Sequence, residues 1–159
     1  MKKSILWAPW RVGYIQHSKK EKGCLFCRVL KSKNDAKNLV ILRSKHTVAL
    51  LNLYPYTNGH VIVSPLRHVK SLEYLNEAEI LDLMHTVNRI KQRLDRLLHP
   101  DGFNIGINIG RAGGAGIAQH VHVHIVPRWF GDVNFMPVLF ETKIISQSLK
   151  QVYRALTKR

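Results

Sequence analysis

The sequence predicts an α+β domain built on an antiparallel sheet of about five strands, with one long helix and short flanking helices. Short runs rich in valine, isoleucine and leucine, bounded by turn residues, indicate the strands. Between residues 76 and 98 the apolar residues instead recur at helical spacing, which indicates an amphipathic helix on one face of the sheet. The strand-like runs are 39–42, 47–53, 60–64, 103–109 and 120–126.

The first three of these strands are separated by turns. A basic turn at 43–46 parts the first strand from the second, and a loop rich in Pro, Asn and Gly at 52–59 leads into the third, which Pro65 ends. His60 therefore stands at the start of a strand, where a polar side chain can face a site.

The fourth strand alternates with period two, so we expect it to be half buried. The apolar set that falls on one face is Phe103, Ile105, Ile107 and Ile109, and the set on the other face is Asn104, Gly106 and Asn108.

The long helix carries end signals that agree with its apolar spacing. Asn76 is placed to cap it, and Glu77 and Glu79 lie in its first turn, where the helix dipole favours acids. His85 is expected to be solvated. Two shorter helices are expected over residues 25–32 and 144–157.

The length of 159 residues fits a single domain, 1–159. We expect an N-terminal arm over about residues 1–20 and a C-terminal aromatic loop plus helix over about residues 127–159. Either the arm lies across an apolar surface, or Trp7, Trp10 and Arg11 reach a base or a phosphate. The aromatic stretch 127–137 forms either a second wall of the site or a dimer contact.

The chain carries 25 Lys and Arg against 10 acids, a formal net charge of +15. This balance favours an anionic partner such as a nucleotide or polyphosphate, with nucleic acid the less favoured choice. No run of about 18 apolar residues and no apolar segment of the secretory kind occurs, so we expect a cytoplasmic protein without a membrane partner.

His120, His122 and His124 alternate with valines, so a strand would place the three imidazoles on one face. Buried imidazoles cost free energy unless each has a partner or a role. The candidate roles are metal ligation, acid–base catalysis and nucleophilic attack on phosphorus or a carbonyl carbon.

Cys24 and Cys27 form a Cys-x-x-Cys pair. The pair is either half of a zinc site, a redox pair or two buried thiols. A tetrahedral zinc ion would need two further ligands, which must be histidines or carboxylates because no other cysteine exists.

The segment 110–118 is rich in glycine and directly precedes the histidine row. Glycines let backbone N–H groups approach an anion closely, which favours a phosphate site. The alternative is a flexible connection between two strands.

Three segments together resemble the histidine-triad (HIT) family of nucleotide hydrolases and transferases. They are the run His120 to Val126 (His-Val-His-Val-His-Ile-Val), Asn52 with residues 58–63, and Asn108 with the glycine loop. The motifs at 7–11, 24–27 and 128–137 resemble the bacterial branch of diadenosine tetraphosphate phosphorylases and hydrolases. The resemblance covers nearly the whole chain.

The resemblance implies roles for individual residues. His122 would attack the phosphorus attached to a nucleoside, His124 would contact the phosphate or protonate the leaving group, and His60 would complete the catalytic cluster. Asn52 would contact the ribose, and Asn108 would hold the phosphate or the leaving group. The phosphate would also meet the backbone N–H groups of Gly114, Ala115, Gly116, Ile117 and Ala118.

One departure concerns the leaving group. Several branches of the family have Gln or Ser within the glycine loop that precedes the triad, whereas residues 116–118 of this loop carry no polar side chain here. Backbone N–H groups or Arg111 would have to contact the leaving group instead.

Zinc-bearing members imply a structural metal held by Cys24, Cys27, His68 and His120, with a zinc-free arrangement as the alternative. No cofactor would be required for the chemistry itself. The resemblance further implies a symmetric homodimer that joins two sheets.

Several functions follow from the resemblance. The first is cleavage of diadenosine tetraphosphate or related dinucleoside polyphosphates, with inorganic phosphate as co-substrate if the protein is a phosphorylase. The alternatives are a nucleoside phosphoramidase, an enzyme acting on adenylylsulfate, or a non-catalytic module that binds adenine nucleotides.

Overall fold

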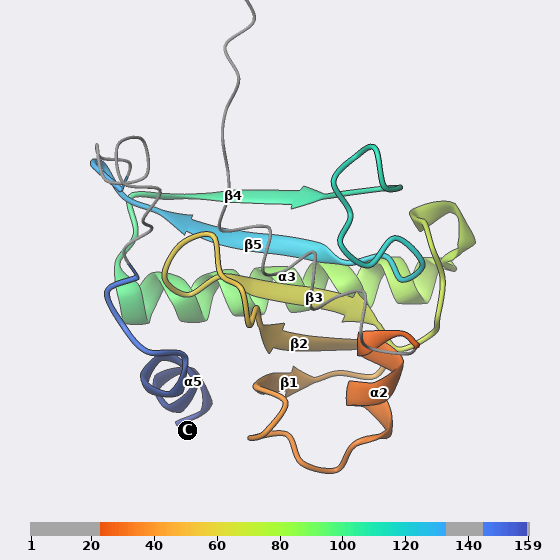
Figure 1. Cartoon of the computed structure of the whole chain (residues 1–159), viewed down its shortest axis with the longest axis horizontal. Helices are drawn as coiled ribbons and strands as arrows, with labels where there is room; N and C mark the ends of the chain where they lie inside the picture. The colour runs from red at the N-terminus through yellow and green to blue at the C-terminus, as the bar shows by residue number, and fades with distance from the viewer. Residues whose placement is uncertain (1–22, 133–144, 159) are drawn as a thin grey trace, which may run out of the picture.

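The computed structural model describes residues 23–132 and 145–158 of the chain. Its sheet has five antiparallel strands in the order β1-β2-β3-β5-β4 (Figure 1). The strands are β1 (Val40–Arg43), β2 (Thr47–Leu51), β3 (Val61–Pro65), β4 (Gly102–Ile107) and β5 (Val123–Arg128). The helical elements are α2 (Leu25–Lys31), the 3-10 turn η1 (Leu72–Tyr74), α3 (Glu77–Leu98) and α5 (Leu149–Thr157). The predicted α+β class and antiparallel sheet are therefore confirmed.

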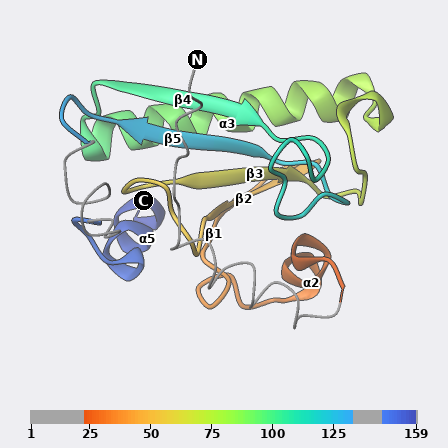
Figure 2. The same ribbon diagram turned by 45° about the horizontal axis from the view of Figure 1, so that its top comes forward.

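The two faces of the sheet pack against different helices. Val61, Val63 and Ile125 belong to the larger core, which the long helix α3 covers (Figure 2). Ile62 belongs to a second core with Phe26 of α2. Because neighbouring residues of a strand point to opposite faces, even-numbered residues of β3 and β5 face away from α3. The histidine row has even numbers and lies on this second face.

The histidine row is only partly a strand, which corrects the predicted strand over 120–126. β5 begins at Val123. Before it, the N–H of His120 closes a turn to Ile117, and the N–H of Val121 donates to Val69 over 2.7 Å. Loop residues, not a neighbouring strand, therefore accept the backbone hydrogen bonds of this stretch. Val121 still lies in the core under α3, so its side chain and those of the histidines point to opposite faces as predicted.

The fourth strand is less buried than its alternation predicts. β4 pairs only with β5 and forms one edge of the sheet. Phe103 and Ile107 pack against the α3 core, whereas Ile105 and Ile109 are 47% and 49% exposed. Burial of an alternating strand depends on what covers its edge, and within residues 23–132 and 145–158 nothing pairs with the outer edge of β4.

Helix α3 begins where the sequence predicts. Asn76 accepts from the N–H of Glu79, and the Glu79 carboxylate accepts from the N–H of Asn76, which forms a capping box. Arg67 forms a two-bond ion pair with the same carboxylate. These bonds, first that of Arg67, lower the pKa of Glu79 to about 2. The pair ties the loop after β3 to the start of α3.

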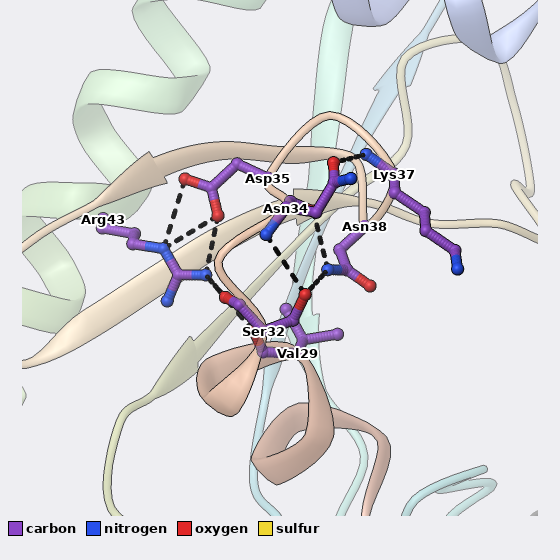
Figure 3. A network of polar contacts seen from close by, with 7 residues as sticks. All are labelled: Val29, Ser32, Asn34, Asp35, Lys37, Asn38 and Arg43. Atoms are coloured by element: carbon purple, nitrogen blue, oxygen red, sulfur yellow. Dashed lines mark hydrogen bonds and ion pairs between the residues drawn. The ribbon is translucent and has the colours of Figure 1, made fainter.

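Helix α2 is tied to β1 at its C-terminal end (Figure 3). The guanidinium of Arg43 donates to the carbonyl oxygens of Val29 and Ser32 and forms an ion pair with Asp35 at 2.7 Å. Carbonyl groups at the end of a helix lack partners within the helix, so this contact satisfies them. The position of α2 matters for the site because α2 contains Cys27, begins directly after Cys24, and contributes Phe26 to the second core.

None of the described helices is both long and apolar enough to cross a membrane. The predicted arm with Trp7, Trp10 and Arg11 lies outside the described residues, as do residues 133–137 of the aromatic stretch 127–137. His85 is exposed, as predicted.

Candidate active site and metal cluster

Five imidazoles lie near one another on the face of the sheet that α3 leaves free: His120, His122 and His124 of the histidine row, with His68 at one end and His60 at the other. The ring centroids of His68 and His120 lie 5.0 Å apart, those of His122 and His124 4.9 Å, and those of His124 and His60 5.1 Å. The five imidazoles thus extend from the loop after β3, across the start of β5, to the start of β3. The structure brings together all three of the predicted catalytic histidines.

His122 lies in the middle of the row and is 3% exposed. Its Nδ1 atom lies 2.9 Å from the carbonyl oxygen of His120. A carbonyl oxygen can only accept, so Nδ1 carries the proton and Nε2 keeps its lone pair. Burial lowers the pKa of His122, which keeps the ring neutral near pH 7. The bare Nε2 is therefore a nucleophile that needs no separate base.

His124 has the opposite tautomer, which the groups around His60 determine. The backbone N–H of Tyr56 donates to Nδ1 of His60 over 3.1 Å, and the side-chain amide of Asn52 lies 3.2 Å from the same atom. The proton of His60 is therefore on Nε2, which donates to Nδ1 of His124 over 3.0 Å. His124 must then carry its own proton on Nε2.

The two neighbouring imidazoles of β5 are thus complementary. Burial, and then the neighbouring His122, lowers the pKa of His124 to about 4. At neutral pH His124 is an uncharged N–H donor beside an uncharged nucleophile, His122. This pairing suits attack on a phosphorus atom whose oxygens gain negative charge.

Asn52 is half-buried just after β2. Its side-chain oxygen accepts from the N–H of Tyr54 over 3.0 Å, while its amide faces His60. In the structure Asn52 is thus part of the bonding that sets the His60 tautomer, and its predicted ribose contact stays a prediction.

The glycine loop folds back on itself through its first half. The N–H of Gly114 donates to Arg111, the N–H of Ala115 donates to Gly110, and the Asn108 amide donates to the carbonyl of Gly114. Gly110 and Gly114 have φ of 72° and 85°, a conformation that favours glycine.

These bonds reduce the number of backbone N–H groups that are available for the predicted phosphate site. Two of the five predicted N–H donors, Gly114 and Ala115, already have acceptors inside the loop. In the described part of the chain the N–H groups of Gly116, Ile117 and Ala118 have no acceptor. Ile117 packs against the core of Phe26, which brings this half of the loop to the histidine face.

The predicted metal ligands also come together. The ligand atoms of Cys24, Cys27, His68 and His120 all lie within 4.8 Å of one another, and the described residues contain no second group of this kind. Sγ of Cys24 is 3.3 Å from Nδ1 of His120, and Sγ of Cys27 is 3.2 Å from Nδ1 of His68 and 3.8 Å from Nδ1 of His120.

These distances fit a tetrahedral zinc ion. At the usual zinc–ligand lengths, a sulfur and a nitrogen on one zinc ion stand about 3.6 Å apart. His120 is also in the required tautomer, because its Nε2–H donates to the carbonyl of Pro65 over 3.0 Å and leaves Nδ1 bare. Burial raises the pKa of Cys27, so its sulfur would be a thiol without a cation beside it.

Comparison with known proteins now identifies the family. The family model described as "HIT domain" matches residues 33–131. The chain belongs to the HIT family. It is 36% identical to a protein named AP-4-A phosphorylase from Mycobacterium tuberculosis over 159 residues, 95% of this chain and 81% of that protein. This confirms the resemblance drawn from the three motifs.

Two further HIT proteins are similar. A bis(5'-nucleosyl)-tetraphosphatase (asymmetrical) from Schizosaccharomyces pombe is 39% identical over 89 residues, 56% of this chain and 48% of that protein. The crystal structure of a Zn-bound histidine triad family protein from Mycobacterium smegmatis has a TM-score of 0.67 and 27% identity, over 88% of this chain and 92% of that one.

Sequence reasoning missed two residues of the site. Phe26 is fully buried, with its ring 5.0 Å from that of His120 and 5.2 Å from that of His122. Its place between the two cysteines was the available signal. Tyr56 acts through its backbone N–H and stacks its ring on His124, and neither contact leaves a trace in the residue pattern.

A hollow of about 450 Å³ lies elsewhere on the described part of the molecule. Asn58, Leu98 and Trp129 line it, and no histidine of the row does. The hydrogen-bond geometry, not the volume, makes the histidine face the candidate active site, because an open phosphate site need not be a deep cavity.

Proposed function

We propose that this HIT protein cleaves diadenosine tetraphosphate or related dinucleoside polyphosphates through a covalent nucleotidyl intermediate on His122. The observation that carries the proposal is the neutral, buried His122 with a bare Nε2 beside the N–H donor of His124. The similarity to proteins named AP-4-A phosphorylase and bis(5'-nucleosyl)-tetraphosphatase supports the substrate class.

In the first step Nε2 of His122 attacks the phosphorus attached to one nucleoside. A phosphorus–nitrogen bond forms, and the bond from phosphorus to the bridging oxygen of the polyphosphate breaks. His124 donates its Nε2–H to a phosphate oxygen or to the leaving oxygen, which stabilises the charge that develops there. With diadenosine tetraphosphate the leaving group is ATP.

In the second step an acceptor attacks the same phosphorus and breaks the phosphorus–nitrogen bond. Inorganic phosphate as acceptor releases ADP. Water releases AMP, and the proton that the water loses passes to the solvent, or back to His124 if His124 gave its proton to the leaving oxygen. His122 recovers its lone pair, and throughout the cycle its own proton stays on Nδ1, hydrogen-bonded to the carbonyl oxygen of His120. The histidine therefore needs no net protonation in the cycle.

The glycine loop and the two asparagines would bind the rest of the nucleotide. The N–H groups of Gly116, Ile117 and Ala118 would receive the phosphate oxygens, because they have no acceptor within the described residues. Asn108 would hold the loop through Gly114. Asn52 would contact the ribose while it keeps its amide toward His60.

Cys24, Cys27, His68 and His120 would hold a structural zinc ion. Four protein ligands leave no open position, so the ion would supply shape and not chemistry. The Zn-bound relative supports this assignment.

We also propose a homodimer formed through the outer edge of β4. This strand pairs on one side only, and the exposed Ile105 on it would gain burial against a second copy. Sedimentation of the purified protein, compared with Ile105→Lys, tests it: a dimer that becomes monomeric is expected, and a monomeric wild type contradicts it.

Product analysis tests the catalytic proposal. The protein is incubated with diadenosine tetraphosphate, with and without inorganic phosphate. ATP plus ADP only in the presence of phosphate identifies a phosphorylase, and ATP plus AMP identifies a hydrolase. Turnover of only a nucleoside phosphoramidate or adenylylsulfate, or binding without turnover that His122→Asn leaves unchanged, contradicts the proposal.

A further inference from the structure

His120 takes part both in the Cys/His cluster (Cys24, Cys27, His68 and His120) and in the hydrogen bond that orients His122. Its ring nitrogen Nδ1 points into the Cys/His cluster, 3.3 Å from Sγ of Cys24. Its backbone oxygen accepts the Nδ1 proton of His122 over 2.9 Å and so determines which nitrogen of His122 is bare. Any shift of His120 that lengthens this bond would free His122 to take the other tautomer, whose Nε2 carries a proton and cannot attack.

Phe26 makes a second connection between the cluster and His122. It lies between the two cysteines on α2, is fully buried, and contacts the rings of both His120 and His122. The cysteines determine where the N-terminal end of α2 lies, while Arg43 holds the C-terminal end (Figure 3). We therefore expect the position of the Phe26 ring to depend on whether a metal ion joins the four ligands of the cluster.

The loop that carries His68 makes a third connection. Within five residues it offers the Pro65 carbonyl to Nε2 of His120 and the Val69 carbonyl to the N–H of Val121. Arg67 ties it to Glu79 at 2.7 Å. His68 is the exposed member of the cluster. A metal ion bound to both His68 and His120 would join this loop to the His120 ring, in addition to the two backbone contacts.

We propose that the Cys/His cluster positions the catalytic nucleophile: a metal bound there holds His120 and Phe26 in place, and they keep His122 with Nε2 bare. His120 and Phe26 are then positioning residues, and the occupancy of the cluster controls the rate of the chemical step. The effect on rate rests on the proposed function, whereas the effect on the His122 tautomer does not.

The size of the effect follows from what would remain without metal. The four ligands would be joined only by thiol–imidazole contacts of 3.2 to 3.8 Å, which are weak hydrogen bonds. Loss of groups that orient a site from outside the reacting atoms typically costs about 10- to 100-fold in activity. We expect kcat to fall in this range, with KM changed less than about threefold, because the substrate contacts stay.

The test compares His68→Ala with the matched control His85→Ala, which removes an exposed histidine from α3. Bound zinc, kcat and KM are measured for both. Nitrogen-15 NMR at one neutral pH reports which ring nitrogen of His122 carries the proton, and the signal is assigned by its loss in His122→Asn. We expect His68→Ala to lose zinc, to lose 10- to 100-fold in kcat and to show both His122 tautomers. His85→Ala should match the wild type in all three.

A second pair of variants keeps the test decisive if His68→Ala does not fold. Phe26→Leu keeps an apolar side chain but removes the ring beside His122, and Val29→Ala opens the same core while it keeps the Phe26 ring. Phe26→Leu should lower kcat and mix the tautomers, while Val29→Ala should only lower the melting temperature.

A zinc-free His68→Ala protein with wild-type kcat and a single Nδ1–H tautomer of His122 would overturn the proposal. A wild-type protein that binds zinc but turns over no dinucleoside polyphosphate would overturn the proposed function instead, and the tautomer comparison would still decide the coupling.

Discussion

His120 and His122 stand two residues apart on one face, and yet they have opposite protonation patterns. His120 donates from Nε2 to Pro65 and presents a bare Nδ1 to two sulfurs, while His122 donates from Nδ1 to His120 and presents a bare Nε2. The difference lies in which backbone carbonyl each ring meets. Carbonyl position, rather than residue type, thus separates the proposed metal end of the row from the proposed catalytic end.

Removal of the nucleophile should break the catalytic end and leave the metal end intact. We expect His122→Asn to lower kcat by about 10⁴-fold or more, because asparagine cannot form the covalent intermediate. Zinc content should stay equal to that of the wild type. Steady-state kinetics and metal analysis of the variant check both ends, and a loss below tenfold would contradict the role of His122.

Removal of the His60 donor should have the next largest effect. His60→Leu leaves Nδ1 of His124 without a donor, so His124 can place its proton there and lose its Nε2–H. We expect kcat to fall about 100-fold, the lower range for a proton donor. His60→Gln, whose amide can donate to His124, should recover part of the loss. Equal rates for the two variants would show that packing, not donation, explains His60.

The pH profile should separate this site from ordinary histidines. Burial lowers the pKa of His122 and brings that of His124 to about 4, so each ring takes up its proton at a lower pH than an ordinary histidine does. We expect the acid-side fall of kcat/KM to be centred below pH 6.5. A decline centred near 6.5 would contradict the neutral pair.

The same shifts affect stability. A histidine whose pKa is lower in the folded state takes up its proton first in the unfolded chain. The stability that neutral His124 contributes is thus present above about pH 6.5 and is lost as the pH falls toward 4. Thermal unfolding of the wild type and of His124→Asn over this window should show a smaller acid loss for the variant. Parallel losses would contradict this.

The anchor of α2 should have the smallest effect. Arg43→Ala removes the bonds to the end of α2 and an ion pair whose members are one-third to nearly one-half exposed. We expect a loss of about 1 kcal/mol, or about 2–4 °C in melting temperature. The loss should be larger in zinc-free protein, where no metal holds the N-terminal end of α2. Equal losses with and without zinc would show that the two ends of α2 act independently.

Much of this account was accessible from the sequence, and the rest depends on neighbours that are distant along the chain. Local signals placed α3, through the Asn76 cap, and the half-buried character of Phe103. They could not show that Ile105 is exposed, because that depends on β4 lying at the sheet edge.

The same distinction holds for the site. The proposed nucleophile His122 and the four proposed metal ligands followed from motifs. The structure brings the four ligands together and places His122 beside His124. The tautomers could not be predicted, because they depend on the carbonyls of Pro65 and His120 and on the N–H of Tyr56. These are backbone groups, which are the same for nearly every residue type and so leave no mark in the sequence. The interruption of the predicted strand before Val123 has the same cause: the partner of Val121 is the loop residue Val69.

The covalent intermediate is the most direct test of the account. The protein is mixed with excess diadenosine tetraphosphate without phosphate, quenched within milliseconds in alkaline denaturant, which preserves a histidine–phosphorus bond, and digested for mass spectrometry. The account predicts one adenylyl group on the peptide that contains His122, absent in His122→Asn. ATP release without any adenylylated peptide, or an adduct on His124 instead, would contradict it.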